Sequence, residues 1–142
     1  MRIAAPEDGR VVADPLTPEA KRFINKHLYG VAQLELLLHL RDNPSESLTP
    51  SMAARELRLG EEQAVGLLHD LHSRGLLAIE KSEGRKRYRY EPTTRALARQ
   101  VEAVAKIYPA YRHRVIQLIF SKPPESVTNF AQAFRLRKDE DG

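Results

Sequence analysis

Residues 49–90 decide the fold, and they read TPSMAARELRLGEEQAVGLLHDLHSRGLLAIEKSEGRKRYRY. Thr49-Pro50 supplies a capping hydroxyl and a first-turn proline, which together favour the start of a short helix. After a turn at Leu59-Gly60, a second helix is indicated by apolar residues at helical spacing: Ala64, Leu67, Leu68 and Leu71. Gly75 ends that helix, and a strand pattern on each side of residues 82–84 predicts a β-hairpin. The predicted order is helix, turn, helix, hairpin.

The chain on the N-terminal side of this stretch adds two helices. Residues 1–16 are expected to form an extended arm. Thr17-Pro18 favours the start of a short helix, and the apolar spacing over residues 31–40 predicts a mostly buried core helix. Residues 17–92 therefore form one predicted unit, which is mainly α with a small β-hairpin.

A long helical pattern follows in residues 93–138. Pro109 lies inside this pattern and lacks a backbone donor, so two helices over residues 94–108 and 110–121 are predicted in place of one. Ser126 begins a last helical pattern, whose apolar residues are Val127, Phe130, Ala131 and Phe134. Residues 139–142 are expected to be a disordered tail.

Apolar residues recur in this C-terminal region at alternating spacings of four and three, the pattern of a helix-packing seam. The seven seam residues are Leu97, Val101, Val104, Tyr108, Tyr111, Val115 and Leu118. Such a seam packs against a helix of the same chain or of a second copy. Because a unit of this size leaves little internal surface to cover the seam, we expect a homodimer with these residues at its interface.

The composition narrows the classes of function. The 142-residue chain has no cysteine, which excludes thiolate metal sites and cysteine nucleophiles. His69 and His72 lie one helical turn apart, but no third or fourth ligand accompanies them, so neither a metal nor another cofactor is expected. The chain contains no nucleophile elbow and no glycine-rich phosphate loop, so we expect no enzyme. Without a secretory signal or a spanning apolar run, a cytoplasmic location is expected.

Positive charge is concentrated on the predicted hairpin. Residues 81–90 carry a net charge of plus four, because Glu83 opposes five cations: Lys81, Arg85, Lys86, Arg87 and Arg89. Side chains alternate along a strand, so the three arginines share one face and the two tyrosines pack on the other. The arginine face either contacts phosphates or is a solvated face in which Arg87 or Arg89 pairs with Glu80. We favour phosphate contact.

Residues 31–90 resemble the winged helix-turn-helix of bacterial transcriptional regulators of the MarR and ArsR type. The likeness lies in the core helix, the helix at 49–57, the turn at Leu59-Gly60, the helix that ends at Gly75, and the hairpin, or wing. The resemblance implies that the second motif helix enters the major groove of double-stranded DNA, with the wing on the backbone and a dimer on paired half-sites. The residues predicted to contact DNA are Arg55, Gln63, Ser73, Lys81, Arg85, Lys86, Arg87 and Arg89; Gly66 and Asp70 are also expected to face the groove.

The second motif helix departs from the family pattern because it is acidic. Residues 59–75 carry Glu61, Glu62 and Asp70 against Arg74, a net charge of minus two that repels phosphates. An alternative function is therefore a protein-interaction module, or adaptor, that holds a partner protein through this acidic helix or through the tail with Phe130 and Phe134. The leading prediction is a DNA-binding transcriptional regulator.

Overall fold

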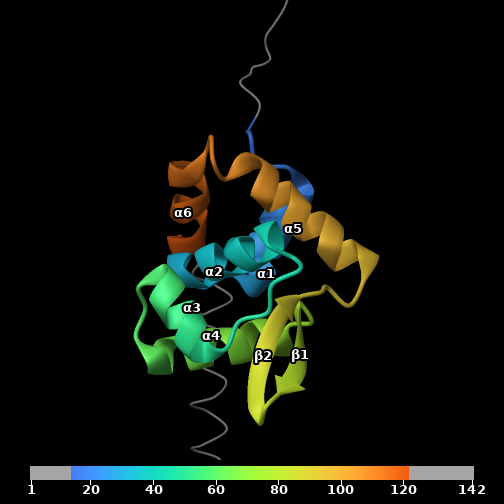
Figure 1. The fold of residues 1–142 in the computed structure, drawn as a ribbon. Helices are drawn as coiled ribbons and strands as arrows, with labels where there is room; N and C mark the ends of the chain where they lie inside the picture. Colours follow the sequence, from blue (N-terminus) through green and yellow to red (C-terminus); the bar gives the residue numbers. More distant parts are fainter. Residues whose placement is uncertain (1–13, 122–142) are drawn as a thin grey trace, which may run out of the picture.

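The computed structural model describes residues 14–121, which form six helices and one two-stranded hairpin in the predicted order. The elements are α1 (Pro18–His27), α2 (Val31–Asp42), α3 (Pro50–Leu57), α4 (Glu61–Ser73), β1 (Leu77–Ser82), β2 (Arg85–Tyr90), α5 (Arg95–Ile107) and α6 (Arg112–Phe120). In Figure 1, α2 lies between α5 and α6 above it and α3, α4 and the hairpin below it. The predicted class, mainly α with a small β-hairpin, is confirmed.

Threonine side chains fix the starts of three helices. The hydroxyl of Thr17 accepts from the backbone N–H of Ala20 at 3.1 Å, and Thr49 accepts from Met52 at 3.2 Å. Thr94 caps α5 in the same way. Each hydroxyl satisfies an N–H that has no partner within its own helix. The predicted starts at Thr17-Pro18 and Thr49-Pro50 are confirmed, and the interruption at Pro109 separates α5 from α6 as predicted.

The turn between α3 and α4 lies at Leu59-Gly60 as predicted, and Gly60, with φ of −66°, is the N-cap of α4. The left-handed residue of this turn is Arg58, with φ of 57°, which the sequence does not indicate. A left-handed conformation costs a non-glycine residue about 1–2 kcal/mol, so this turn is held by its surroundings rather than by local preference. The side chain of Arg58 is consequently exposed at the corner between α3 and α4.

The hairpin has a tight turn and a fixed register. Leu77 pairs with Tyr90 at its base and Ser82 with Arg85 at its tip. Glu83 and Gly84 both have positive φ, 54° and 78°, which suits a two-residue turn and the natural twist of the strands. Leu48 adds a single bridge to Tyr88 through two backbone hydrogen bonds of 2.9 and 2.8 Å. The segment before α3 is thus joined to the hairpin.

The seam of the C-terminal helices is covered from within the chain by α1, which packs against both α5 and α6. Val101, Val104 and Val115 have no exposed surface, Tyr108 is buried, Leu97 and Leu118 are partly buried, and Tyr111 is 48% exposed. The expectation that the chain lacks an internal partner for this seam is therefore wrong, because Ala20, Phe23 and Ile24 of α1 supply one. The three valines have no surface left for a second copy.

Several predictions fall outside the described residues. These are most of the extended arm, the last helical pattern with Phe130 and Phe134, and the tail at 139–142. The boundary between residues 92 and 93 stays a prediction. Within residues 14–121, no helix is both long enough and apolar enough to cross a membrane.

Candidate nucleic-acid interface

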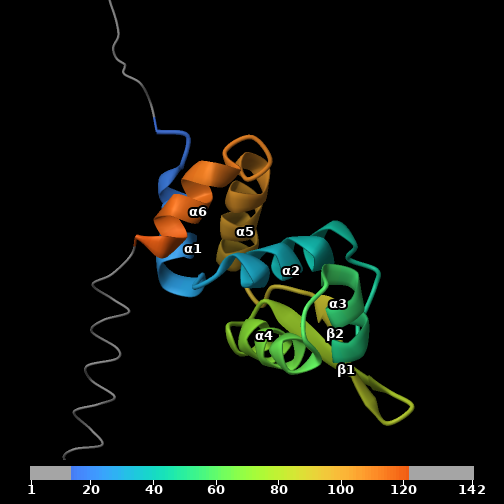
Figure 2. The ribbon, with the colours of Figure 1, turned by 90° about the vertical axis from the view of Figure 1, so that its left-hand side faces the viewer.

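Three cations project at the distal end of the hairpin, which extends beyond the helices in Figure 2. Lys81, Arg85 and Lys86 are exposed, and none of them forms an ion pair with any residue in the described part of the chain. Lys81 and Lys86 are direct cross-strand partners. Like charges placed opposite each other destabilise a hairpin, and an anion bound between them removes that penalty. The tip is therefore suited to a polyanion.

Two of the five hairpin cations are already engaged within the chain. The guanidinium of Arg89 contacts Glu80 at 2.5 Å and Glu91 at 2.6 Å, and these hydrogen bonds and charges raise its pKa, with the bond to Glu91 the largest cause. Arg87 is half-buried, and its Nη1 donates to the backbone oxygen of Ser47 at 3.4 Å. The pairing of Arg89 with Glu80 is the one expected if the arginine face is solvated and does not contact phosphates. Of the three arginines, Arg85 is the one fully open to a ligand.

The outer face of α4 carries most of the residues expected there. Gln63, Gly66 and Ser73 are exposed, together with Glu62, Val65 and His69. Arg55 is exposed on the neighbouring helix α3. Asp70 is only partly exposed, at 37% of its side chain, because its Oδ2 accepts from Gln33 Nε2 at 2.8 Å and from Arg74 Nε at 2.9 Å. Outward presentation would break both bonds.

Two of the three acids of α4 are held by neighbouring side chains. Asp70 forms an ion pair with Arg74, one helical turn away, and Glu61 accepts a hydrogen bond from the hydroxyl of Ser51 in α3. Glu62 is the acid for which the described residues show no partner. The Asp70–Arg74 pair is neutral as a unit, so the net charge of minus two on this helix comes from Glu61 and Glu62 at its N-terminal end.

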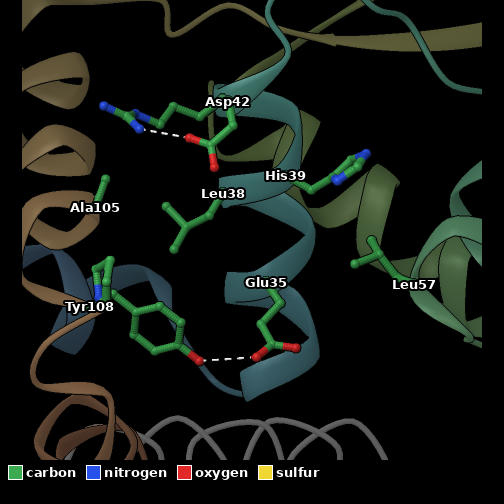
Figure 3. Close-up of a pocket in the computed structure, with 9 residues that line it drawn as sticks. Glu35, Leu38, His39, Asp42, Leu57, Ala105 and Tyr108 are labelled. Carbon is green, nitrogen blue, oxygen red and sulfur yellow. Dashed lines mark hydrogen bonds and ion pairs between the residues drawn. The ribbon is translucent and has the colours of Figure 1, made fainter.

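A cavity of about 420 Å³ is lined by α2, the end of α3 and the C-terminal end of α5 (Figure 3). Tyr108 of α5 and Glu35 of α2 face each other at one end of it, and the tyrosine hydroxyl donates to Glu35 Oε2 at 3.1 Å. His39 Nε2 lies 3.5 Å from Glu56 Oε1 but makes no hydrogen bond. Among residues 14–121, no three His, Asp or Glu side chains gather into a metal-binding group.

Tyr90, at the base of the hairpin, gives a prediction about stability and pH. Its hydroxyl is buried without a hydrogen-bond partner among the described residues, and burial, helped by the charge of Glu102, raises its pKa to about 12. Since the folded pKa lies above the unfolded value of 10.0, the associated stability is present below pH 10 and is lost as the pH rises toward 12.

Tyr90→Phe should therefore leave the free energy of unfolding at pH 7 unchanged or raise it by up to about 1 kcal/mol. The variant should also lose less stability than the parent between neutral pH and pH 11. Urea unfolding at both pH values measures this, with Tyr111→Phe as the exposed control. A clear loss of stability at pH 7 would mean that the hydroxyl has a partner.

Solved structures from bacteria share this arrangement of helices and hairpin. Mb0332 from Mycobacterium bovis, described as a homodimeric winged helix-turn-helix DNA-binding domain of a possible ArsR-family regulator, aligns with a TM-score of 0.50. The two chains are 19% identical over 66% of this chain and 82% of the solved fragment, residues 1–100 of Mb0332. This chain has the winged helix-turn-helix fold. In it, α3 and α4 are the helix-turn-helix, and β1 and β2 are the wing.

Two other solved structures align with more of the chain. MepR, a transcription regulator of the Staphylococcus aureus multidrug efflux pump MepA, has a TM-score of 0.52 and 17% identity over 85% of this chain and 87% of its own. The heme sensor PefR from Streptococcus agalactiae has a TM-score of 0.50 and 19% identity over 86% and 80% of the two chains. No protein-family model and no curated protein sequence matches. The resemblance seen in residues 31–90 is thus confirmed as a shared fold.

Proposed function

We propose that this chain is a transcriptional regulator that binds double-stranded DNA through the tip of its wing and the outer face of α4, without catalysis. The observation that carries the proposal is the exposed group of Lys81, Arg85 and Lys86, which has no ion-pair partner in residues 14–121. Phosphate contacts by such cations supply most of the affinity of proteins for DNA. A protein of this kind would work in the cytoplasm.

The residues divide by the kind of contact they would make. Lys81, Arg85 and Lys86 would bind phosphates at the wing, and Arg55 would bind the backbone beside α3. Gln63 and Ser73 are the base-reading candidates, because an amide pairs with the N6 and N7 of adenine and a hydroxyl donates or accepts. Arg87 and Arg89 would reach phosphates only by leaving their present partners.

We also propose that the DNA-binding form is a homodimer. Mb0332, which has the same fold, is described as homodimeric. In this chain the C-terminal helices leave Tyr111 and Phe120 exposed, at 48% and 70%. A two-fold dimer would present two wings and two α4 helices to paired half-sites. The interface would use these exposed residues together with the outer edges of Leu97 and Leu118, since the middle of the seam is buried within the chain.

The adaptor alternative receives less support. Its motivation is the acidic character of α4, but the contacts of Glu61 and Asp70 with Ser51, Gln33 and Arg74 lie within the chain, which leaves Glu62 as the acid of α4 without a partner among residues 14–121. The solved structures of the same fold, Mb0332 and MepR, are described as a possible regulator and a transcription regulator. Absence of any binding to mixed genomic DNA below about 100 μM at low salt would favour the adaptor, because that is weaker than nonspecific binding by DNA-binding proteins.

The salt dependence of DNA binding tests the wing directly. Three phosphate contacts per wing correspond to a slope of log affinity against log salt of about −2.7, or about −5.4 for the two wings of a dimer. The triple variant K81A/R85A/K86A should flatten the measured slope by about that amount and weaken binding at every DNA sequence alike. A mobility-shift titration at four salt concentrations measures both effects.

Arg89→Ala is the matched control for this experiment. It removes a guanidinium from the same strand, but one that already contacts Glu80 and Glu91. The slope should change by less than about one unit. An unchanged slope in the triple variant, or an equal change in both variants, would contradict the assignment of phosphate contacts to the wing tip.

A further inference from the structure

Gln33 lies where the turn between α1 and α2 meets α4, and its side chain joins the two. It is 3% exposed. Its Nε2 donates to the backbone oxygen of His27 at 2.9 Å and to Asp70 Oδ2 at 2.8 Å, and its Oε1 accepts from the backbone N–H of Tyr29 at 2.7 Å. Both amide hydrogens and the amide oxygen are therefore used, with two bonds to the turn and one to α4.

The surroundings of Gln33 allow one orientation of its amide. The nitrogen faces a carbonyl and a carboxylate, which both accept, and the oxygen faces an N–H, which donates. A rotated amide would place an oxygen against two acceptors and an NH₂ against a donor. A carboxylate cannot replace this amide, because it can accept from Tyr29 but cannot donate to His27 or Asp70.

A second link from α4 reaches the same turn. Arg74 pairs with Asp70 and its Nη1 lies 3.4 Å from the backbone oxygen of Lys26 and 3.4 Å from His27 Nδ1. The guanidinium also lies over the ring of Tyr29, 4.9 Å from its centre. The C-terminal half of α4 is thus held against the end of α1 by a continuous polar group: Gln33, Asp70 and Arg74.

Apolar packing does not close the space beside this polar group. A cavity of about 310 Å³ lies between the start of α2 and α4, and Gly30, Ala32, Leu67 and Gln63 are among the residues that line it with Gln33 and Asp70. Side chains that border empty space lose the packing contacts that resist movement. The polar bonds therefore add to the packing of Leu67 in holding α4 on this side, and Gln63, a base-reading candidate, borders the same cavity.

We propose that Gln33 is a positioning residue that couples the turn between α1 and α2 to α4. Displacement of that turn pulls on Asp70 and shifts the outer face of α4. The coupling is a property of the fold. Its consequence for DNA affinity rests on the proposed function.

Gln33→Met tests the coupling, because it keeps the length and neutrality of the side chain and removes all three hydrogen bonds. Hydrogen exchange of backbone amides should become about tenfold faster in peptides from α4, the change expected for loss of roughly one net hydrogen bond, while α5 stays unchanged. Val115→Ala, a buried change in α6, is the control and should not single out α4. Equal acceleration in α4 and α5 of Gln33→Met, or none, would overturn the proposal.

Charge repulsion between residues 33 and 70 gives a second, independent test. Gln33→Glu sets a carboxylate against Asp70 and should accelerate exchange in α4 more than Gln33→Met does. The double variant Q33E/D70N should recover part of the loss, because the introduced amide can donate to the introduced carboxylate. Circular dichroism would establish that both variants are folded. If exchange in α4 were then as fast in Q33E/D70N as in Gln33→Glu, the two positions would not be coupled through the hydrogen bond between residues 33 and 70.

DNA affinity separates the coupling from the function. If the parent chain binds DNA, Gln33→Met should weaken specific binding about tenfold at a temperature where it is fully folded, with the wing contacts intact. Unchanged affinity together with a loosened α4 would overturn the claim that Gln33 positions α4 for DNA. If the parent chain does not bind DNA, the proposed function fails, and the exchange data alone decide the coupling.

Discussion

Replacing Phe23 by alanine should lower the free energy of unfolding by about 3–5 kcal/mol, the usual cost of removing a buried aromatic ring from a core. Phe23 has no exposed surface, and its ring centre lies 5.1 Å from that of His27 in the same helix. It belongs to the face of α1 that covers α5 and α6. Since small domains are stable by about 5–15 kcal/mol, the variant should be close to unfolding at ambient temperature.

Urea unfolding measures this loss, and Tyr111→Ala is the control on the seam itself. Tyr111 is 48% exposed, so its truncation should cost less than about 1 kcal/mol in the monomer. Both measurements belong at protein concentrations low enough to dissociate any dimer. A small effect of Phe23→Ala, or a large effect of Tyr111→Ala under those conditions, would mean that the seam is not covered by α1.

Replacing Gly75 by alanine should cost about 2–4 kcal/mol, from backbone strain and a steric clash together. Gly75 connects α4 to the wing with φ of 82°, where a side chain is strained. An added Cβ would also lie 2.7 Å from Thr93 Oγ1, while the backbone N–H of Thr93 donates to the oxygen of Gly75 at 2.8 Å. The connection therefore leaves no room for a methyl group.

The double variant G75A/T93A separates the two causes. It removes the clashing hydroxyl but leaves the strained backbone, so about 1–2 kcal/mol of the loss should remain. Gly66→Ala is the matched control, because nothing lies within 4 Å of its added Cβ in the middle of α4. That change should stabilise the chain by about 0.5–1 kcal/mol. Thermal unfolding of the three variants measures these differences. If Gly75→Ala were as stable as Gly66→Ala, both the backbone strain and the clash at Gly75 would be contradicted.

Local signals in the sequence predicted most of the fold. A threonine followed by proline starts a helix for reasons contained in those two residues, and the structure confirms both instances, at Thr17 and Thr49. Pro109 interrupts the C-terminal helical pattern because it lacks a backbone N–H, and this holds whatever residues surround it. The alternation along the hairpin also predicted that Tyr88 packs inward, and it is 5% exposed.

The remaining features depend on contacts between distant residues. Gln33 and Asp70 are 37 positions apart, so no local pattern shows that they form a hydrogen bond. The seam has the same spacing whether α1 or a second copy covers it, and three-dimensional packing alone distinguishes the two. The left-handed Arg58 has no sequence signal, because neither glycine nor asparagine marks the position.

The bridge between Leu48 and Tyr88 restricts movement of the hairpin relative to α3. It joins the segment before α3 to the middle of the hairpin through two backbone hydrogen bonds, so α3 and the hairpin should move as one unit. Because α4 packs against α3, the proposed DNA contacts of α4 and of the wing tip should keep a constant separation. Under the proposed function, no inserted base pair between those two contacts should be tolerated within a half-site, whereas the gap between half-sites would depend on how two copies join.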